Sequence, residues 1–212
     1  MTKNAIIFDM DGTMWDTTEA ILPVWNEVLR KYSNETSKQI SKAEMDSYMG
    51  KTLEQIAQLS LPELDIKRGF EILSECCKTE CKSLEETGAI IYPMLIGTLK
   101  ELKEKYSLLI VSNCQDGYIQ SFLTYYKLWD MFDDFEFAGR TGKTKGENIK
   151  LIMERNNTFK AVYVGDTQSD FEAAKFAEID FIFAEYGFGN AENYKYSIKE
   201  FSDLPNLIKK IF

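Results

Sequence analysis

The chain has 212 residues, of which 44% are hydrophobic and 28% are charged, a composition typical of a globular protein with a sizeable core. Its 34 acidic and 25 basic residues give a formal net charge of −9, which disfavours binding to nucleic acid or to an anionic membrane through bulk charge. The sequence contains no histidine, which excludes a Ser-His or Cys-His nucleophile, a histidine general base and a His-ligated zinc site. Any catalysis therefore depends on carboxylates, Lys, Ser, Thr or Cys.

The cysteines and the N-terminus indicate a reduced intracellular environment. The four cysteines contain no C-x-x-C spacing, and so few cysteines in a chain of this length favour free thiols. The apolar run at residues 5–8 is too short for the core of a signal peptide, and no apolar run approaches the ~20 residues that a membrane helix needs. We therefore expect a cytoplasmic protein without a membrane partner.

Short apolar runs that end in polar residues recur along the chain. They are residues 5–8 before Asp9, 108–111 before Ser112 and 161–164 before Gly165-Asp166, with a shorter run at 181–183. Helical patterns separate them at 95–106, 147–156 and 171–178. Buried strands that alternate with such helices predict an α/β fold with a Rossmann-like parallel sheet. Because ligands of such sheets bind beyond the carboxyl ends of the strands, we expect these polar residues to meet in one crevice.

The segment 16–88 has helical spacing and no strand signal. Capping boxes predict two helix starts within it, at Ser41-x-x-Glu44 and Thr52-x-x-Gln55. We therefore expect a small α-helical cap domain at 16–88, inserted after the first strand of a core domain formed by residues 1–15 and 89–212. Such a cap would fold over the crevice.

Two pairs of carboxylates follow predicted strands. Asp9 and Asp11 are two residues apart, so one can attack or hold a metal while the other moves a proton. Asp166 and Asp170 follow another strand. Four acids in one crevice would repel one another without a cation, and oxygen ligands without His or Cys indicate Mg²⁺. The alternatives are a polar turn after the first strand and, for Asp170, a residue at the start of the next helix.

Other polar residues fall at the same predicted edge of the sheet. The hydroxyl, amide and backbone N–H groups of Ser112 and Asn113 suit phosphoryl oxygens, although an ordinary turn or cap uses the same residues. Lys145 would bring a positive charge to this edge. A lone lysine is more often solvated, and Lys143 is close enough in sequence to take its place.

Four segments, taken in chain order, resemble the four motifs of the haloacid dehalogenase-like hydrolase superfamily. They are Asp9-Met10-Asp11-Gly12-Thr13, Ser112-Asn113, Lys145 and the stretch from Gly165-Asp166 to Asp170. The stretch 91–113 and the loop Gly187-Phe188-Gly189 also resemble the phosphoglycolate-phosphatase-like branch, whose helical cap follows the first motif.

The resemblance implies a role for each matching residue. Asp9 would be the nucleophile that takes the phosphoryl group, and Asp11 would be the acid/base. Mg²⁺ would be held by the Asp9 carboxylate, the Asp11 carbonyl and Asp166, with Asp170 acting largely through water. Ser112 and Lys145 would bind the phosphoryl group and offset its charge. Implied substrate contacts are Thr13, Ser112, Asn113 and Lys51, the last equally compatible with an exposed lysine beside a helix start.

The implied activity is that of a Mg²⁺-dependent phosphatase acting on a small phosphorylated metabolite through an aspartyl phosphate. One alternative is a phosphosugar mutase of the β-phosphoglucomutase type, although that branch commonly carries a histidine in the helix of the first motif. Another is a non-catalytic module that binds a phosphometabolite, against which the retention of the acid/base Asp11 argues. Dehalogenation is disfavoured because those relatives lack this second acid. The natural substrate and the oligomeric state stay open.

Overall fold

The computed structural model of the chain describes residues 4–212, which divide into two compact units that we treat separately. Unit 1 contains the described residues up to Asp16, together with Ile90–Asn113 and Trp129–Phe212. Unit 2 contains Thr17–Ala89 and Cys114–Leu128. Unit 2 thus adds a second stretch of chain to the segment for which we predict a cap.

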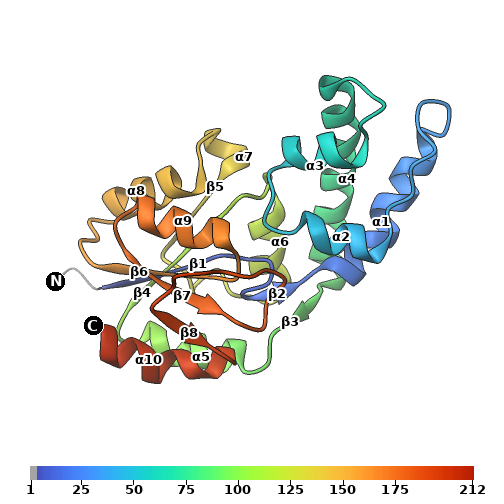
Figure 1. The fold of residues 1–212 in the computed structure, drawn as a ribbon. Helices are drawn as coiled ribbons and strands as arrows, with labels where there is room; N and C mark the ends of the chain where they lie inside the picture. The colour runs from blue at the N-terminus through green and yellow to red at the C-terminus, as the bar shows by residue number, and fades with distance from the viewer. Residues whose placement is uncertain (1–3) are drawn as a thin grey trace. The chain divides into compact units, whose positions relative to one another are not determined.

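Unit 1 is built on a six-stranded parallel sheet with the strand order β5-β4-β1-β6-β7-β8 (Figure 1). Its strands are β1 (Ala5–Phe8), β4 (Ser107–Ser112), β5 (Asp134–Phe137), β6 (Ala161–Gly165), β7 (Asp180–Ala184) and β8 (Tyr196–Ile198). A separate antiparallel pair joins β2 (Trp15–Asp16) to β3 (Ile90–Ile91). The central strands are buried along their length, as expected for a parallel sheet covered on both faces. The predicted α/β fold is confirmed.

Helices cover both faces of this sheet (Figure 1). One face carries α8 (Lys145–Arg155) and α9 (Gln168–Phe176), and the other carries α5 (Leu95–Lys103) and α10 (Leu204–Ile211). The short helices α7 (Ala138–Thr141) and η1 (Phe201–Asp203) lie in the connections. A buried apolar cluster fills the layer beneath α8 and α9 and includes Ile7, Leu109, Val111, Ile149, Ile152 and Tyr163.

Two predicted helix starts were too late. The helices predicted from 147 and 171 begin at Lys145 and Gln168, because capping boxes start them at Thr144 and Thr167. Each box pairs the threonine with an acidic side chain three residues on, Glu147 or Asp170. Asp170 is therefore a first-turn residue of α9.

Unit 2 is helical throughout its regular elements. They are α1 (Thr18–Lys31), α2 (Lys42–Tyr48), α3 (Leu53–Ser60), α4 (Ile66–Thr87) and α6 (Tyr118–Tyr125). Both predicted capping boxes are present, at the starts of α2 and α3. A buried carboxylate, Glu80 of α4, accepts hydrogen bonds from the Trp25 indole and the Gln115 amide and so links three segments of the unit. The four cysteines are free thiols, and no described helix is long and apolar enough to span a membrane.

The sheet gives a direct stability prediction. Ile7 lies in β1, between β4 and β6, and is fully buried, so Ile7→Ala removes buried methyl groups and leaves a cavity. We expect the free energy of unfolding to fall by about 2–5 kcal/mol in urea denaturation. Phe159→Ala is the control, since this side chain is 87% exposed, and it should change stability by less than about 0.5 kcal/mol. Equal effects of the two substitutions would contradict this account of the core.

Candidate active site

The register of the sheet brings the predicted polar residues to one edge. Phe8, the last residue of β1, pairs with Ile110 of β4 on one side and with Val164 of β6 on the other. Asp9 therefore leaves the sheet between the strand that ends at Ser112 and the strand followed by Asp166. This is the convergence that the strand-end pattern predicts.

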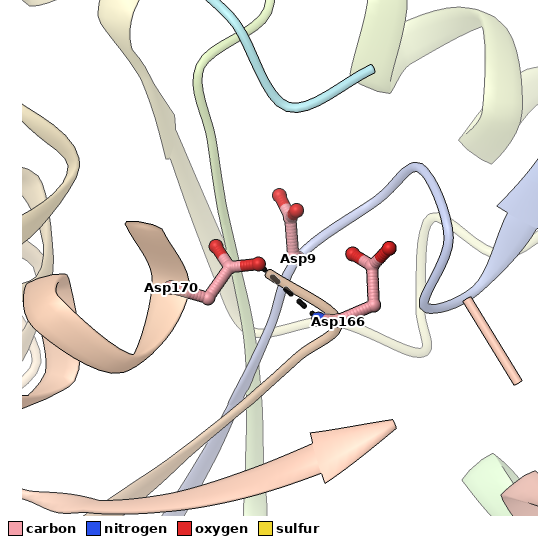
Figure 2. A group of neighbouring side chains, drawn as sticks. All are labelled: Asp9, Asp166 and Asp170. Atoms are coloured by element: carbon pink, nitrogen blue, oxygen red, sulfur yellow. Dashed lines mark hydrogen bonds between the residues drawn. The ribbon is translucent and has the colours of Figure 1, made fainter. Parts of the chain in front are cut away.

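Three carboxylates form a cluster at this edge. Asp9, Asp166 and Asp170 each place an oxygen within 4.8 Å of the others, and all three side chains are buried. Figure 2 shows them coming from three separate segments, with Asp170 also bonded to the backbone of Asp166. Buried acids at this spacing repel one another strongly unless positive charge is supplied.

Lys145 supplies one positive charge. Its ammonium lies 2.6 Å from Asp170 Oδ1 and 3.1 Å from Asp9 Oδ1, and the side chain is almost fully buried. The Thr144 capping box makes Lys145 the first residue of α8, which fixes its backbone beside the cluster. Lys143 lies before that helix and is exposed. The structure thus places Lys145, and not Lys143, among the acids.

The two oxygens of Asp170 are already occupied. Oδ1 accepts from Lys145, while Oδ2 accepts from the backbone N–H of Asp166 and from the N–H and hydroxyl of Thr167 at 3.2, 3.0 and 2.7 Å. Asp170 therefore holds the lysine and the start of α9 in place. It has little capacity left for a direct ligand.

Asp166, in contrast, keeps one oxygen open. Its Oδ2 accepts from the backbone N–H groups of Phe188 and Gly189 at 2.8 and 3.2 Å. Its Oδ1 is buried without a hydrogen bond from the described residues, and the same holds for Asp9 Oδ1 apart from its ion pair with Lys145. Such orphaned oxygens are costly unless a further ligand satisfies them.

Burial and mutual repulsion shape the charge states of these groups. Burial raises the pKa of Asp166 to about 7, and the charge of Asp170 adds to the effect. Burial also raises the pKa of Asp9 well above its usual value, although the charge of Lys145 opposes this. Burial lowers the pKa of Lys145, but the charges of Asp170 and Asp9 outweigh it, so its pKa lies above the ordinary value and the amine stays charged.

The donor set fits a hard divalent cation. Three buried carboxylates face one lysine, which leaves negative charge uncompensated, and the orphaned oxygens belong to Asp9 and Asp166. Oxygen donors without nitrogen or sulfur suit Mg²⁺. Gly12, at φ +74°, packs so closely that a Cβ there would lie 2.1 Å from Asp166 Oδ2, so the turn after β1 closes against this carboxylate.

The remaining predicted residues differ in their placement. Asp11 is half-buried in the turn after β1, and Thr13 in the same turn is fully buried with a hydroxyl for which no described residue is a partner. Ser112 is buried at the end of β4 and Asn113, next to it, is half-buried. Lys51 belongs to unit 2, where it is exposed and its ammonium donates to the Ser47 carbonyl at 2.7 Å.

Comparison with known proteins agrees with this geometry. A sequence model described as haloacid dehalogenase-like hydrolase matches residues 6–184. The chain belongs to this family. It is 24% identical to a phosphoglycolate phosphatase of Rhodobacter capsulatus, over 97% of this chain and 96% of that protein. It is 26% identical to a phosphoglycolate phosphatase of Nitrosospira multiformis, over 89% of this chain and 86% of that protein.

The fold is shared with solved structures of such hydrolases. One, a haloacid dehalogenase-like hydrolase from Bacteroides fragilis, superimposes with a TM-score of 0.81 at 23% identity, over 95% of this chain and 99% of that chain. Because the sequence model of the family matches residues 6–184, the predicted resemblance to the haloacid dehalogenase-like hydrolases is confirmed.

The sequence analysis does not identify the loop groups that contact this candidate site. The loop after β7 donates two backbone N–H groups to Asp166, and the Tyr186 hydroxyl in that loop donates to the Thr13 carbonyl at 2.9 Å. The Gly187-Phe188-Gly189 pattern was the available signal, but it does not say which side chain the loop contacts. Tyr163 in β6 was assigned only to a strand.

Gly187 provides a test of this loop. A Cβ at this position would lie 2.2 Å from Asp166 Cβ and 2.5 Å from the Gly12 carbonyl oxygen. We expect Gly187→Ala to lower the free energy of unfolding by about 1–3 kcal/mol, measured in urea, because the backbone must shift. Gly97→Ala in α5 is the control, since open space surrounds the added methyl group and alanine favours a helix. A Gly187→Ala protein as stable as the wild type would show that the loop does not pack as described.

Proposed function

We propose that this chain is a Mg²⁺-dependent phosphatase that hydrolyses a small phosphomonoester through an aspartyl phosphate on Asp9. The observation that carries the proposal is the buried cluster at the carboxyl edge of the sheet, in which Asp9 and Asp166 keep open oxygens beside Lys145. The names of the curated relatives, both phosphoglycolate phosphatases, support the same class of reaction.

The first half-reaction uses Asp9 and Asp11. An oxygen of Asp9 attacks the phosphorus, the bond to the leaving oxygen breaks, and Asp11 donates a proton to that oxygen. The charge of Lys145 favours the ionised form of Asp9 against the effect of burial and offsets the charge of the phosphoryl group, while Ser112 binds one of its oxygens. Phosphoryl transfer needs in-line positioning and positive charge around the equatorial oxygens, which these groups provide.

The second half-reaction releases the product. Asp11, now ionised, takes a proton from a water molecule, whose oxygen attacks the phosphorus and frees Asp9 together with inorganic phosphate. We assign Mg²⁺ to Asp9, the Asp11 carbonyl and Asp166, with Asp170 contributing through water. When bound, the ion would neutralise charge on the phosphoryl oxygens.

Substrate choice belongs to residues outside the acid cluster. We propose Thr13, Ser112 and Asn113 as contacts for the substrate, and Lys51 as a further contact from a cap formed by residues 16–88. Phosphoglycolate is the first substrate to test because both curated relatives are named for it. A panel of phosphorylated metabolites ranked by kcat/KM measures transition-state discrimination among the candidates.

Asp9→Asn tests the nucleophile. The amide cannot form the acyl phosphate, so we expect hydrolysis of p-nitrophenyl phosphate in the presence of Mg²⁺ to fall by roughly 10³-fold or more. Asp130→Asn, at an exposed position, is the matched control and should keep wild-type turnover. Undiminished turnover by Asp9→Asn would refute the assignment.

Two further assays, product analysis with a sugar 1-phosphate and binding of phosphorylated metabolites, separate the alternatives. Conversion of a sugar 1-phosphate into its isomer without release of phosphate would indicate a mutase. Binding of phosphorylated metabolites without turnover of any of them would indicate a non-catalytic module.

Asp166 gives a stability test of the metal. Its pKa of about 7 in the folded protein lies above the unfolded value of about 4, so the folded state binds more protons between these values. This group therefore makes the metal-free protein less stable as pH rises from about 4 to about 7. Mg²⁺ binds the ionised carboxylate, so it should stabilise the protein more at about pH 8 than at about pH 5.

The measurement is the Tm with excess MgCl₂ or with EDTA at both pH values. Asp166→Asn should remove most of the Mg²⁺-dependent increase, and Asp130→Asn should retain it. A Tm that does not respond to Mg²⁺ at either pH would contradict the metal assignment.

A further inference from the structure

Tyr163 carries a polar group into the apolar layer beneath the site. It lies in the middle of β6, is fully buried, and packs in the cluster that includes Ile7, Val111 and Ile149. A buried hydroxyl costs free energy unless it finds a partner, so a tyrosine here needs a specific acceptor. Phenylalanine would fill the same layer without that requirement.

The acceptor lies two strands away. The Tyr163 hydroxyl donates to the carbonyl of Val111 in β4 at 2.8 Å, although β1 separates β6 from β4 in the sheet. Tyr163 pairs with Ile7 of β1, and Val111 lies one residue beyond the last pair of β1 with β4, Phe8 with Ile110, so the side chain crosses β1 to reach this carbonyl. Val111 shares its peptide group with Ser112. The bond therefore fixes the plane of the peptide that leads into Ser112.

The ring of the same tyrosine lies beside Lys145. The lysine ammonium is 6.0 Å from the ring centroid while it contacts Asp9 and Asp170. This is within the range of a cation–π interaction, which strengthens when water is excluded. One buried side chain thus bonds to the carbonyl before Ser112 and places its ring 6.0 Å from the ammonium of Lys145, the two proposed phosphoryl contacts.

We propose that Tyr163 is a positioning residue for phosphoryl transfer, whose hydroxyl holds Ser112 in the orientation that meets the phosphoryl group. The role rests on the proposed phosphatase function. Tyr163 itself reaches no substrate, since it is covered on all sides. Its effect comes through the position of Ser112. A small displacement of a side chain that contacts the transition state lowers the rate, because that contact is formed fully only in the transition state.

A double-mutant cycle tests this role with p-nitrophenyl phosphate as substrate. Tyr163→Phe keeps the ring and removes the donor, and we expect a fall in kcat of about 10-fold with little change in KM. If the hydroxyl acts through Ser112, the same substitution in a Ser112→Ala background should cost less than about 2-fold, because the positioned group is gone. Tyr163→4-aminophenylalanine, which restores a donor at the same place, should recover most of the lost rate.

Tyr126→Phe is the matched control. The Tyr126 hydroxyl also donates to a backbone carbonyl, that of Ala89, but within unit 2. Tyr126→Phe should change Tm but should not cause the fall in kcat that is expected for Tyr163→Phe. If Tyr163→Phe does not fold, 4-methylphenylalanine at this position fills the volume of the hydroxyl without donating and replaces it in the cycle.

The outcomes separate the two proposals. Absence of turnover in the wild type would overturn the phosphatase function and this role with it. Two other results would overturn the role of Tyr163 alone. One is a kcat that Tyr163→Phe leaves unchanged. The other is a fall in kcat on Tyr163→Phe that has the same factor in the wild type and in the Ser112→Ala background.

Discussion

The site depends on one buried positive charge, the ammonium of Lys145. Without it, Asp9, Asp166 and Asp170 would bring three acids together in a region closed to water, where neighbouring charges are poorly screened. Its contacts with Asp170 and Asp9 reduce the repulsion within the cluster, and the Thr144 capping box at the start of α8 holds its backbone in place. Two further features hold the groups next to this charge. They are the bonds of Asp170 to the start of α9 and the loop that donates to Asp166.

One lysine does not neutralise three carboxylates. The three acids also differ in how many of their oxygens the protein already occupies. Asp170 has both oxygens occupied by protein donors, so its charge serves structure. Among the described residues, Asp166 Oδ1 has no hydrogen-bond partner and Asp9 Oδ1 has only its ion pair with Lys145, so both can take a further ligand. A chain with a net charge of −9 can therefore accept a phosphate dianion in the proposed reaction, because Lys145 and a divalent cation set the local field.

Strand ends could be predicted from the sequence because a buried parallel strand leaves a simple pattern: a continuous apolar run followed by the residues of the site. This pattern alone predicts that Asp9, Ser112 and Asp166 lie at one edge of the sheet, and the structure places them there. The reach of Tyr163 to Val111 could not be predicted, since it depends on the order of β4, β1 and β6. The helical patterns place the starts of α8 and α9 too late, because the capping boxes at Thr144 and Thr167 begin these helices earlier in the chain.

Because the sequence contains no histidine, the proposed reaction gives the roles of nucleophile and proton carrier to Asp9 and Asp11. In that reaction both the nucleophile and the proton carrier are aspartates, so their surroundings must distinguish two carboxylates that are two residues apart. Asp9 is buried at the end of β1 beside Lys145, whose charge favours its ionised form. Asp11 lies half-buried in the following turn, from which a carboxyl group can exchange protons with water. In the proposed reaction, the different surroundings of the two carboxylates assign attack to Asp9 and proton transfer to Asp11.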